Sequence, residues 1–394
     1  MSKIDELIHE YCPDGAEWKK LGDVCDTVTD YVAAGSFADL KKNVPYLATP
    51  DYALLVRTMD IKNGFTSSHP VYISESAFKY LWRVNLDREC IVLPNIGNCG
   101  EVYYIDPKKL PYKHNALATN AILLRSTEVM VRYLYYFFLT PLFQKQLEKI
   151  TSKVGQGKFN KTDLKKLDIP VPPLPVQQEI VRILDSFTEL QDELQKELEE
   201  RKKQYTWLEE ELITGPRYTV KKLSECATVE RGKRLVRKQL SSDKNGGYPV
   251  YQNALEPLGY YSESNRRSNI PFVIAAGAAG KLGYSYTEFW AADDCYTIVN
   301  NRNVYGRYLY YAIEIQSKYL KDHVRMGSIP RIAKSFVEET QIFLPDYQQQ
   351  VIIANKLDTL FQLIDKTIPS EIALRQQQYS YYRDKLLSFP RKEA

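Results

Sequence analysis

The chain has 394 residues, of which 44% are hydrophobic and 26% charged, and its formal net charge is +4. This length exceeds what one compact core usually holds, so two to four domains are expected. The longest lipid-like run, residues 133–143, is too short to span a bilayer, and charges precede any apolar run at the N-terminus. Six cysteines without C-x-x-C spacing indicate reduced, mostly buried thiols in a cytoplasmic protein.

A helical tail is expected at residues 1–17, followed by a globular domain of mixed strands at 18–168. Lys19-Lys20-Leu21 opens this domain, and an apolar, strand-like run precedes Gly97-Asn98-Cys99-Gly100. An aromatic-rich helix is predicted at about 128–150. Its tyrosines and phenylalanines fall on several sides of the helix, which favours core packing over base stacking.

Residues 169–214 predict a stiff, proline-marked linker at 169–175 and then a long helix from Gln177 to Ile213. Apolar or aromatic residues fill eight of ten positions spaced by alternating fours and threes, the pattern of a coiled-coil seam. At 1.5 Å per residue, the helix would be roughly 55 Å long. Eleven acidic and five basic residues lie between Gln177 and Thr214, so the flanking regions are better candidates for phosphate contacts.

The second half repeats these landmarks in the same order. Lys221-Lys222-Leu223 opens a second globular domain at 215–341, and Gly277-Ala278-Ala279-Gly280 matches the earlier glycine pair. Arg132-Tyr-Leu-Tyr-Tyr136 recurs unchanged as Arg307-Tyr-Leu-Tyr-Tyr311, within a second aromatic helix expected at about 305–323. Apart from the landmarks the two domains differ, which suggests that they recognise different things.

A second helical region at 342–394 is the expected partner of the first long helix. In its first part, each residue number exceeds that of the matching residue in the first helix by 173, and in its later part by 174. One extra residue therefore lies between Ile364 and Ile372. Pro369 falls in this window, which predicts a kink or short break with Pro369 starting a new helical turn.

The predicted seam of the two helices consists of Ile180, Leu184, Phe187, Leu194, Leu198, Tyr205, Leu208, Leu212, Ile353, Leu357, Leu360, Tyr379 and Leu386. Asp5-Glu-Leu-Ile8 resembles the end of the first long helix, so the N-terminal tail is expected to pack with the C-terminal end. The predicted fold class is α+β. Two mixed α/β domains alternate with two long helices packed as an antiparallel coiled coil, with pseudo-two-fold symmetry.

Matches to known catalytic motifs in this sequence are short or incomplete. Asn43-Val-Pro-Tyr46 lacks the first proline of the motif found in methyltransferases that act on the amino group of a base, and the four scattered histidines build no metal site. Asp51, Asp60 and Lys62 follow the order of a metal-dependent nuclease site, which leaves a nuclease as one alternative. A coiled-coil assembly protein without DNA specificity is another. We predict neither a catalytic residue nor a metal in this chain.

Basic residues on turn-like segments predict DNA contacts, because Lys and Arg bind phosphates and Arg and Asn can read base edges. The candidates are Arg57, Lys153, Lys158, Asn160, Lys161, Arg231, Lys233, Arg234, Arg237, Lys238, Arg266, Arg267, Arg325 and Arg331.

Two repeated patterns resemble a known family. Pro-x-x-x-x-Gln-x-x-Ile-x-x-x-Leu-Asp occurs at 172–185 and at 345–358, and Arg-(x)3-Tyr-(x)6-Leu follows at 201–212 and at 375–386. Together with the ending at 378–389, they resemble the specificity subunits of type I restriction–modification systems, particularly the IC branch. The resemblance covers the whole chain and is most specific in the helices.

This resemblance implies a division of labour. Each globular part would be a target recognition domain that reads half of a split DNA site, and the helices would fix the gap between the halves. The subunit would have no catalysis or cofactor of its own. Two modification subunits would bring S-adenosylmethionine and methylate adenine, and restriction subunits would bring ATP-driven translocation and Mg²⁺-dependent cleavage.

Overall fold

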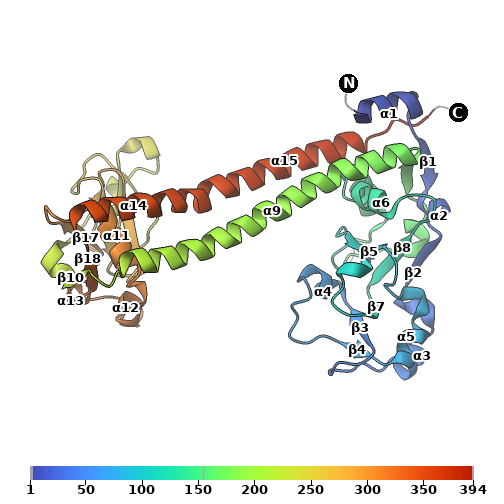
Figure 1. Ribbon diagram of the computed structural model, residues 1–394, viewed down its shortest axis with the longest axis horizontal. Helices are drawn as coiled ribbons and strands as arrows, with labels where there is room; N and C mark the ends of the chain where they lie inside the picture. Colours follow the sequence, from blue (N-terminus) through green and yellow to red (C-terminus); the bar gives the residue numbers. More distant parts are fainter. Residues whose placement is uncertain (1–2, 154, 393–394) are drawn as a thin grey trace. The chain divides into compact units, whose positions relative to one another are not determined.

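The computed structural model describes residues 3–153 and 155–392 of the chain. These residues form two compact units, which Figure 1 shows with their element labels. The first unit comprises the chain up to Glu193 together with the segment from Ala373 onward, and the second comprises Leu194–Ile372. No helix among the described residues is both long enough and apolar enough to cross a membrane.

The strands of the first unit are β1 (Glu17–Lys20), β2 (Thr27–Asp30), β3 (Ala53–Val56), β4 (Tyr72–Ile73), β5 (Cys90–Pro94), β6 (Tyr103–Ile105), β7 (Asn115–Leu117), β8 (Ala121–Arg125) and β9 (Asp168–Val171). An antiparallel sheet has the order β2-β8-β5-β6. A second sheet has the order β4-β3-β7, with β3 and β7 parallel, and β1 pairs with β9. Strands β3, β5 and β8 are buried at every position, which accounts for their apolar sequences, with Arg125 at the end of β8 as the exception.

The strands of the second unit are β10 (Thr219–Lys222), β11 (Ala227–Arg231), β12 (Tyr248–Tyr251), β13 (Gly259–Tyr261), β14 (Ile270–Ile274), β15 (Leu282–Ser285), β16 (Trp290–Ala291), β17 (Cys295–Asn300) and β18 (Gln341–Leu344). Their sheets, β11-β17-β14-β15, β13-β12-β16 and β10-β18, reproduce the strand order of the first unit. The register is also shared, because Lys19 lies opposite Ile169 and Lys221 lies opposite Ile342. The repeated landmarks therefore mark one fold that is used twice.

The helices of the first globular part are α1 (Lys3–Tyr11), α2 (Leu21–Val24), α3 (Phe37–Asn43), α4 (Thr58–Lys62), α5 (Glu75–Tyr80), α6 (Val131–Phe138), α7 (Pro141–Ile150) and α8 (Lys161–Leu164). Those of the second are α10 (Leu223–Cys226), α11 (Gly306–Glu314), α12 (Ser317–Asp322) and α13 (Lys334–Glu338). The short 3₁₀ turns are η1 (Tyr31–Ala34), η2 (Trp82–Val84), η3 (Pro107–Lys109), η4 (Arg237–Gln239) and η5 (Lys244–Gly246).

The prediction of one aromatic helix in each half was wrong in its extent, because each divides into two helices. In the first unit, the Thr140 hydroxyl caps α7 by accepting a hydrogen bond from the amide of Phe143, and Pro141 occupies the first turn. In α6, Tyr133, Tyr136 and Phe137 are all buried. These aromatic side chains belong to the core.

Helix α9 runs without interruption over Leu174–Ile213. It begins three residues before the predicted start, because Pro175 lies in the first turn, where its missing amide hydrogen breaks no helical bond. The predicted linker is correspondingly shorter, and part of it forms β9. All eight predicted seam residues of α9, from Ile180 to Leu212, are buried or half-buried.

The partner of α9 consists of α14 (Tyr347–Gln362), a π-helical turn η6 (Leu363–Thr367) and α15 (Ile368–Leu386). Within the first unit, the beginning of α9 lies beside the end of α15, where the rings of Phe187 and Tyr382 stack 5.6 Å apart. Within the second unit, the end of α9 lies beside α14, where Tyr205 is 6.3 Å from Phe361. The pairing is antiparallel, as predicted.

The irregularity predicted near Pro369 is a π-helical turn and not a break. The backbone keeps right-handed helical angles at both borders of the turn, Leu363 and Ile368. A π turn holds one residue more than an α turn, so it accommodates the extra residue found in this window. It also relieves the clash that Pro369, the second residue of α15, would make with the preceding α-helical turn.

The two ends of the described chain meet within the first unit. The amide of Ala16 donates to the carbonyl of Pro390 at 3.0 Å, and the amide of Lys392 donates to the carbonyl of Ala16 at 3.1 Å. Ile4 of α1 belongs to the same hydrophobic core as Leu387. The N-terminal tail therefore packs against the end of the second helical region.

Candidate nucleic-acid interface

An ion pair attaches the aromatic helix of the first unit to α9. Arg132 Nε donates to Asp185 Oδ1 at 2.8 Å, and the Tyr136 hydroxyl donates to the same carboxylate oxygen. The guanidinium also lies 4.5 Å from the ring centre of Tyr104, a cation–π contact. Burial is the largest single effect and lowers the pKa of Arg132, but the hydrogen bond to Asp185 and the electrostatic interactions with Tyr136, Asp185 and Tyr104 together outweigh it. The pKa of Arg132 is therefore raised, and the side chain stays charged. We call Arg132, Tyr136 and Asp185 the first clasp.

The second unit repeats this arrangement as the second clasp, formed by Arg307, Tyr311 and Asp358. Arg307 Nε donates to Asp358 Oδ1 at 2.7 Å, and the Tyr311 hydroxyl donates to that oxygen at 2.6 Å. Tyr284 takes the place of Tyr104, with the guanidinium 4.7 Å from its ring centre. The verbatim Arg-Tyr-Leu-Tyr-Tyr repeat thus serves to fasten each globular part to a long helix.

A glutamine adds a second attachment in each unit. Gln177 Oε1 accepts from the amide of Met130 at 3.0 Å, and its Nε2 donates to the carbonyl of Pro172 at 2.7 Å. In the second unit, Gln350 accepts from the amide of Tyr305 at 2.8 Å and donates to the carbonyl of Pro345 at 2.9 Å. Both glutamines are buried, so the long helix fixes the start of each aromatic helix.

Each central sheet carries a glycine turn after its strand β5 or β14. Gly97 and Gly277 have φ of 85° and 86°, and Gly100 and Gly280 are also in the left-handed region. Residues that carry a side chain rarely adopt a backbone φ in this range, which explains why glycine recurs at both positions. Nothing lies within 4 Å of where a Cβ of Gly97 would be, so this turn is open on its outer side.

A basic turn lies against each glycine turn. In the first unit, the amide of Ser152 donates to the carbonyl of Lys158 at 2.9 Å, and the carbonyl of Gly157 accepts from the amide of Gly97 at 2.9 Å. Lys153 and Lys158 are both exposed. Lys153 makes only a loose surface pair with Glu148, 3.8 Å away.

The second unit has an equivalent turn between Arg325 and Arg331, whose backbones form two hydrogen bonds of 2.8 and 3.1 Å. The carbonyl of Pro330 accepts from the amide of Gly277 at 3.0 Å, which matches the contact of the first unit. Both arginines are exposed. The turn that carries Arg325 and Arg331 is therefore structurally equivalent to the turn that carries Lys153 and Lys158.

A further group of exposed basic residues in the second unit lies beside the turn between Arg325 and Arg331. Arg231 Nε donates to the carbonyl of Asp293 at 2.8 Å, and Arg331 Nη1 is 3.8 Å from Asp294 Oδ1, so the segment 291–294 brings these arginines together. Lys233 joins them through its amide, which donates to the carbonyl of Ala291. Exposed cations continue along the chain at Arg234, Arg237 and Lys238.

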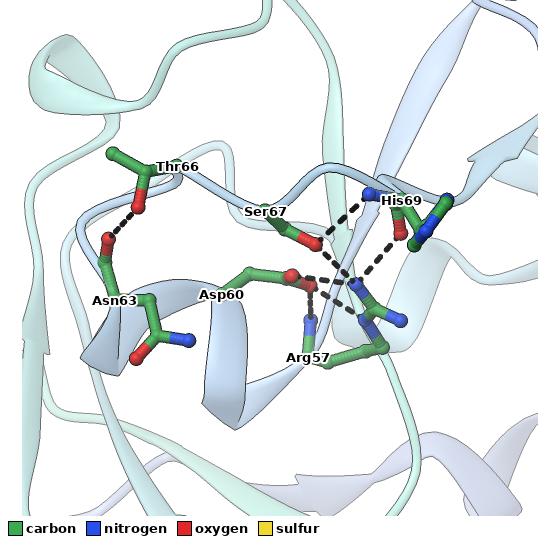
Figure 2. A network of polar contacts seen from close by, with 6 residues as sticks. All are labelled: Arg57, Asp60, Asn63, Thr66, Ser67 and His69. Carbon is green, nitrogen blue, oxygen red and sulfur yellow. Dashed lines mark hydrogen bonds and ion pairs between the residues drawn. The ribbon is translucent and has the colours of Figure 1, made fainter. Parts of the chain in front are cut away.

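Arg57 already has internal partners. It makes two bonds to the buried Asp60, Nε to Oδ2 at 2.8 Å and Nη2 to Oδ1 at 2.7 Å, and Nη2 also donates to the carbonyl of His69 at 3.0 Å (Figure 2). The loop around it is stabilised further by the Thr66 hydroxyl, which donates to the carbonyl of Asn63. In this arrangement Arg57 fixes the shape of the loop.

Four other predicted residues also have partners inside the fold. Lys161 Nζ is 2.8 Å from Asp30 Oδ1, and Asn160 caps α8 by accepting from the amide of Asp163. Arg266, with a side chain only 12% exposed, donates to Thr297 Oγ1 at 2.7 Å and pairs with Glu230. Arg267 Nη2 donates to Asn300 Oδ1 at 3.1 Å. Sequence spacing could not reveal these partners, because most of them are distant in the chain.

The proposed nuclease residues are not brought together as a metal site. Asp60 forms an ion pair with Arg57, and Lys62 Nζ forms an ion pair with Glu101 at 2.5 Å. Asp51 Oδ1 accepts from the amide of Tyr52. Within residues 3–153 and 155–392, no group of three potential metal-binding side chains is present.

Two exposed residues near the glycine turn of the first unit were not among the predicted DNA contacts. Asn98 lies within the glycine turn, and Lys62 is held next to that turn through Glu101. The repeated glycine pair marked the turn, but only the fold shows that α4 lies beside it.

A match to a protein-family model identifies the family to which this chain belongs. The model for the type I restriction modification DNA specificity domain matches residues 13–201 and 217–374. The chain belongs to this family. It is 28% identical over 303 residues to the specificity subunit of a type I restriction enzyme from Escherichia coli, covering 68% of this chain and 73% of that protein.

Two solved type I specificity subunits share the fold. The S subunit from M. genitalium gives a TM-score of 0.59 at 17% identity, over 95% of this chain and 96% of that one. The HsdS subunit from Thermoanaerobacter tengcongensis gives 0.53 at 14% identity, over 96% and 97%. Membership of the type I specificity family confirms the predicted fold class and a role in DNA sequence specificity.

Proposed function

We propose that this type I specificity chain reads a DNA target in two separate halves, one with each unit. The observation that carries the proposal is the repetition of strand order, clasp and glycine turn around loops of different sequence. Because the fold is repeated, each unit presents its loops to DNA in the same way. Because the loops differ in sequence, the two units would read different bases. We also propose that the paired long helices set the gap between the two half-sites.

The exposed basic turns are the proposed contacts to DNA. Lys153 and Lys158 would serve the first half-site, and Arg231, Lys233, Arg325 and Arg331 the second, with Arg234, Arg237 and Lys238 extending that surface. For Arg57, Lys161 and Arg266, the internal pairs support a different role, in which they hold the loops that carry the reading residues.

The partners and cofactors of the proposal follow from the family. Two modification subunits would bind this chain and bring S-adenosylmethionine for adenine methylation, and restriction subunits would bring ATP and Mg²⁺. The chain itself would be non-catalytic, would act in the cytoplasm, and would belong to the IC-like branch. The Escherichia coli relative is the specificity subunit of a type I restriction enzyme, which supports assembly with such partners.

Charge removal at the first basic turn tests the assignment of the contacts. With Lys153→Gln/Lys158→Gln in the complex with modification subunits, we expect weaker binding to a target duplex. The slope of log K against log salt should fall by about 2, because each lost phosphate contact removes roughly 0.9. Lys41→Gln/Lys42→Gln, on exposed positions of α3, removes the same charge and should leave the slope unchanged. Equal slopes for both variants would refute the assignment.

A further inference from the structure

A cavity of about 480 Å³ lies in the first unit, at the end of the central sheet that is remote from the glycine turn. Strand β8 begins with Ala121 opposite Pro94, which leads to that turn, and ends with Arg125 opposite Thr27. Arg125, Thr27 and residues of η2 line the cavity. It is therefore separate from the proposed DNA-reading surface.

Arg125 is buried at the base of this cavity with one donor unused. Its side chain is 6% exposed, and Nη2 donates to the carbonyl of Asn85 at 2.7 Å and to Asp87 Oδ1 at 3.0 Å. Its Nε is buried and has no hydrogen-bond partner among the described residues. A buried donor without a partner is costly, so an acceptor supplied from outside would stabilise this arginine.

The lining carries an excess of positive charge. Four cations, Arg83, Arg88, Arg125 and Lys165, face two carboxylates, Asp26 and Asp87. Asp87 is already paired with Arg125, and Asp26 accepts from the hydroxyl of Thr27 at 2.8 Å. Arg88 and Lys165 are exposed, and neither forms an ion pair within the described part of the chain. Two exposed cations without an ion pair among the described residues thus line the same cavity as Arg125, whose buried Nε has no partner.

We propose that this cavity binds a phosphate group. A tetrahedral phosphate offers several acceptor oxygens and one negative charge as a phosphodiester or up to two as a monoester, which suit an arginine fork flanked by exposed cations. The group could come from the backbone of bound DNA or from a free phosphate-bearing molecule, and the chemistry of recognition is the same. Strand β17, the counterpart of β8, contains no basic residue, so the site is a property of the first unit.

Thermal unfolding of the full chain in sodium phosphate, compared with sodium chloride at equal ionic strength, tests the cavity directly. We expect a saturable rise in Tm that is specific to phosphate, because a ligand that binds only the folded state stabilises it. Arg88→Gln/Lys165→Gln should abolish that rise, since both side chains are exposed and their loss should not prevent folding. The control Lys113→Gln/Arg217→Gln removes two exposed cations elsewhere and should keep it.

Binding to a duplex of about 40 base pairs distinguishes the two sources of phosphate. If the site takes a DNA phosphate, Arg88→Gln/Lys165→Gln should lower the salt slope by about 1 relative to the control. A phosphate-specific rise in Tm with an unchanged slope assigns the site to a free phosphate-bearing molecule. The proposal is overturned if the slope is unchanged and the rise in Tm is either absent or equal in the variant and the control. The unfolding experiment does not depend on DNA recognition, so it separates this proposal from the proposed function.

Discussion

Asp185 and Asp358 each hold together a globular part and a long helix. The Arg307 side chain is only 6% exposed, whereas Asp358 is 35% exposed, so the arginine depends on this carboxylate more than the reverse. A buried charge that loses its partner is strongly destabilising. The clasps are therefore the side-chain contacts on which the attachment of each recognition domain depends most.

We predict that Asp358→Ala lowers the stability of the second unit by about 2 kcal/mol, somewhat below the usual cost for a fully buried pair. Scanning calorimetry should show an earlier transition for that unit. Asp365→Ala removes an exposed carboxylate from the adjacent π turn and should change stability by less than about 0.5 kcal/mol. Similar losses from both substitutions would show that the clasp has no special role.

Glu209 of α9 gives the second unit a dependence on pH. Burial is the main cause that raises its pKa to about 7, and the nearby carboxylate of Glu314 adds to the shift, while the hydroxyl of Tyr205, which donates at 3.2 Å, opposes it. Glu314 also has a raised pKa, chiefly through burial. A carboxyl group with a raised pKa in the folded state favours folding while it is protonated. That contribution is lost as pH rises from about 4.5 through 7.

We predict that Glu209→Gln makes the second unit more stable than the unsubstituted chain at pH 8 but not at pH 5. The gain at pH 8 should be about 1 kcal/mol, because partial exposure screens much of the effect. Thermal unfolding between these pH values measures it. Glu210→Gln, on the exposed neighbouring position, should show no such difference. A gain that does not vary with pH would contradict the raised pKa.

At the scale of elements, the π turn explains how helices of unequal length keep one seam. Ile364 lies within the turn and Ile372 follows it; both are half-buried, and the buried Ile368 lies between them. They are eight residues apart, whereas two α-helical turns of a seam take seven. The wider turn absorbs the difference, so the apolar face stays continuous.

We predict that deletion of Lys366 in a Pro369→Ala background converts the π turn to α-helix and costs less than about 1 kcal/mol. The proline must be replaced, because it would cost about 3 kcal/mol inside a regular helix. Deletion of the exposed Lys203 from α9 rotates the following seam by about 100° and should destabilise the second unit severely. Circular dichroism with thermal unfolding compares the two, and equal damage would exclude the π turn as a register device.

The elements that sequence could predict were those with local signals. The seam, the repeated Arg-Tyr-Leu-Tyr-Tyr and the glycine pair predicted the long helices and the duplicated frame, because periodicity and glycine restrict the backbone directly. The π turn could be located as an extra residue but not identified, since a proline is compatible with several distortions. The partners of Arg57 and Arg266 could not be predicted, because Asp60 looked like a metal ligand and Thr297 is distant in sequence.

At the scale of the whole molecule, the duplicated unit is the central feature. Both copies have the same sheets, the same clasp and the same turn beside exposed cations, on loops that share little sequence. A chain that read one continuous site would need no second copy of the frame. We therefore expect its target to consist of two unlike half-sites with a fixed gap.

The most direct test replaces residues 18–165 with the equivalent domain of another type I specificity subunit and maps N6-methyladenine in cells that also carry the modification subunit. We predict a bipartite methylated motif in which one half changes and the other half and the gap stay the same. A motif that changes in both halves, or one that is not bipartite, would contradict this prediction.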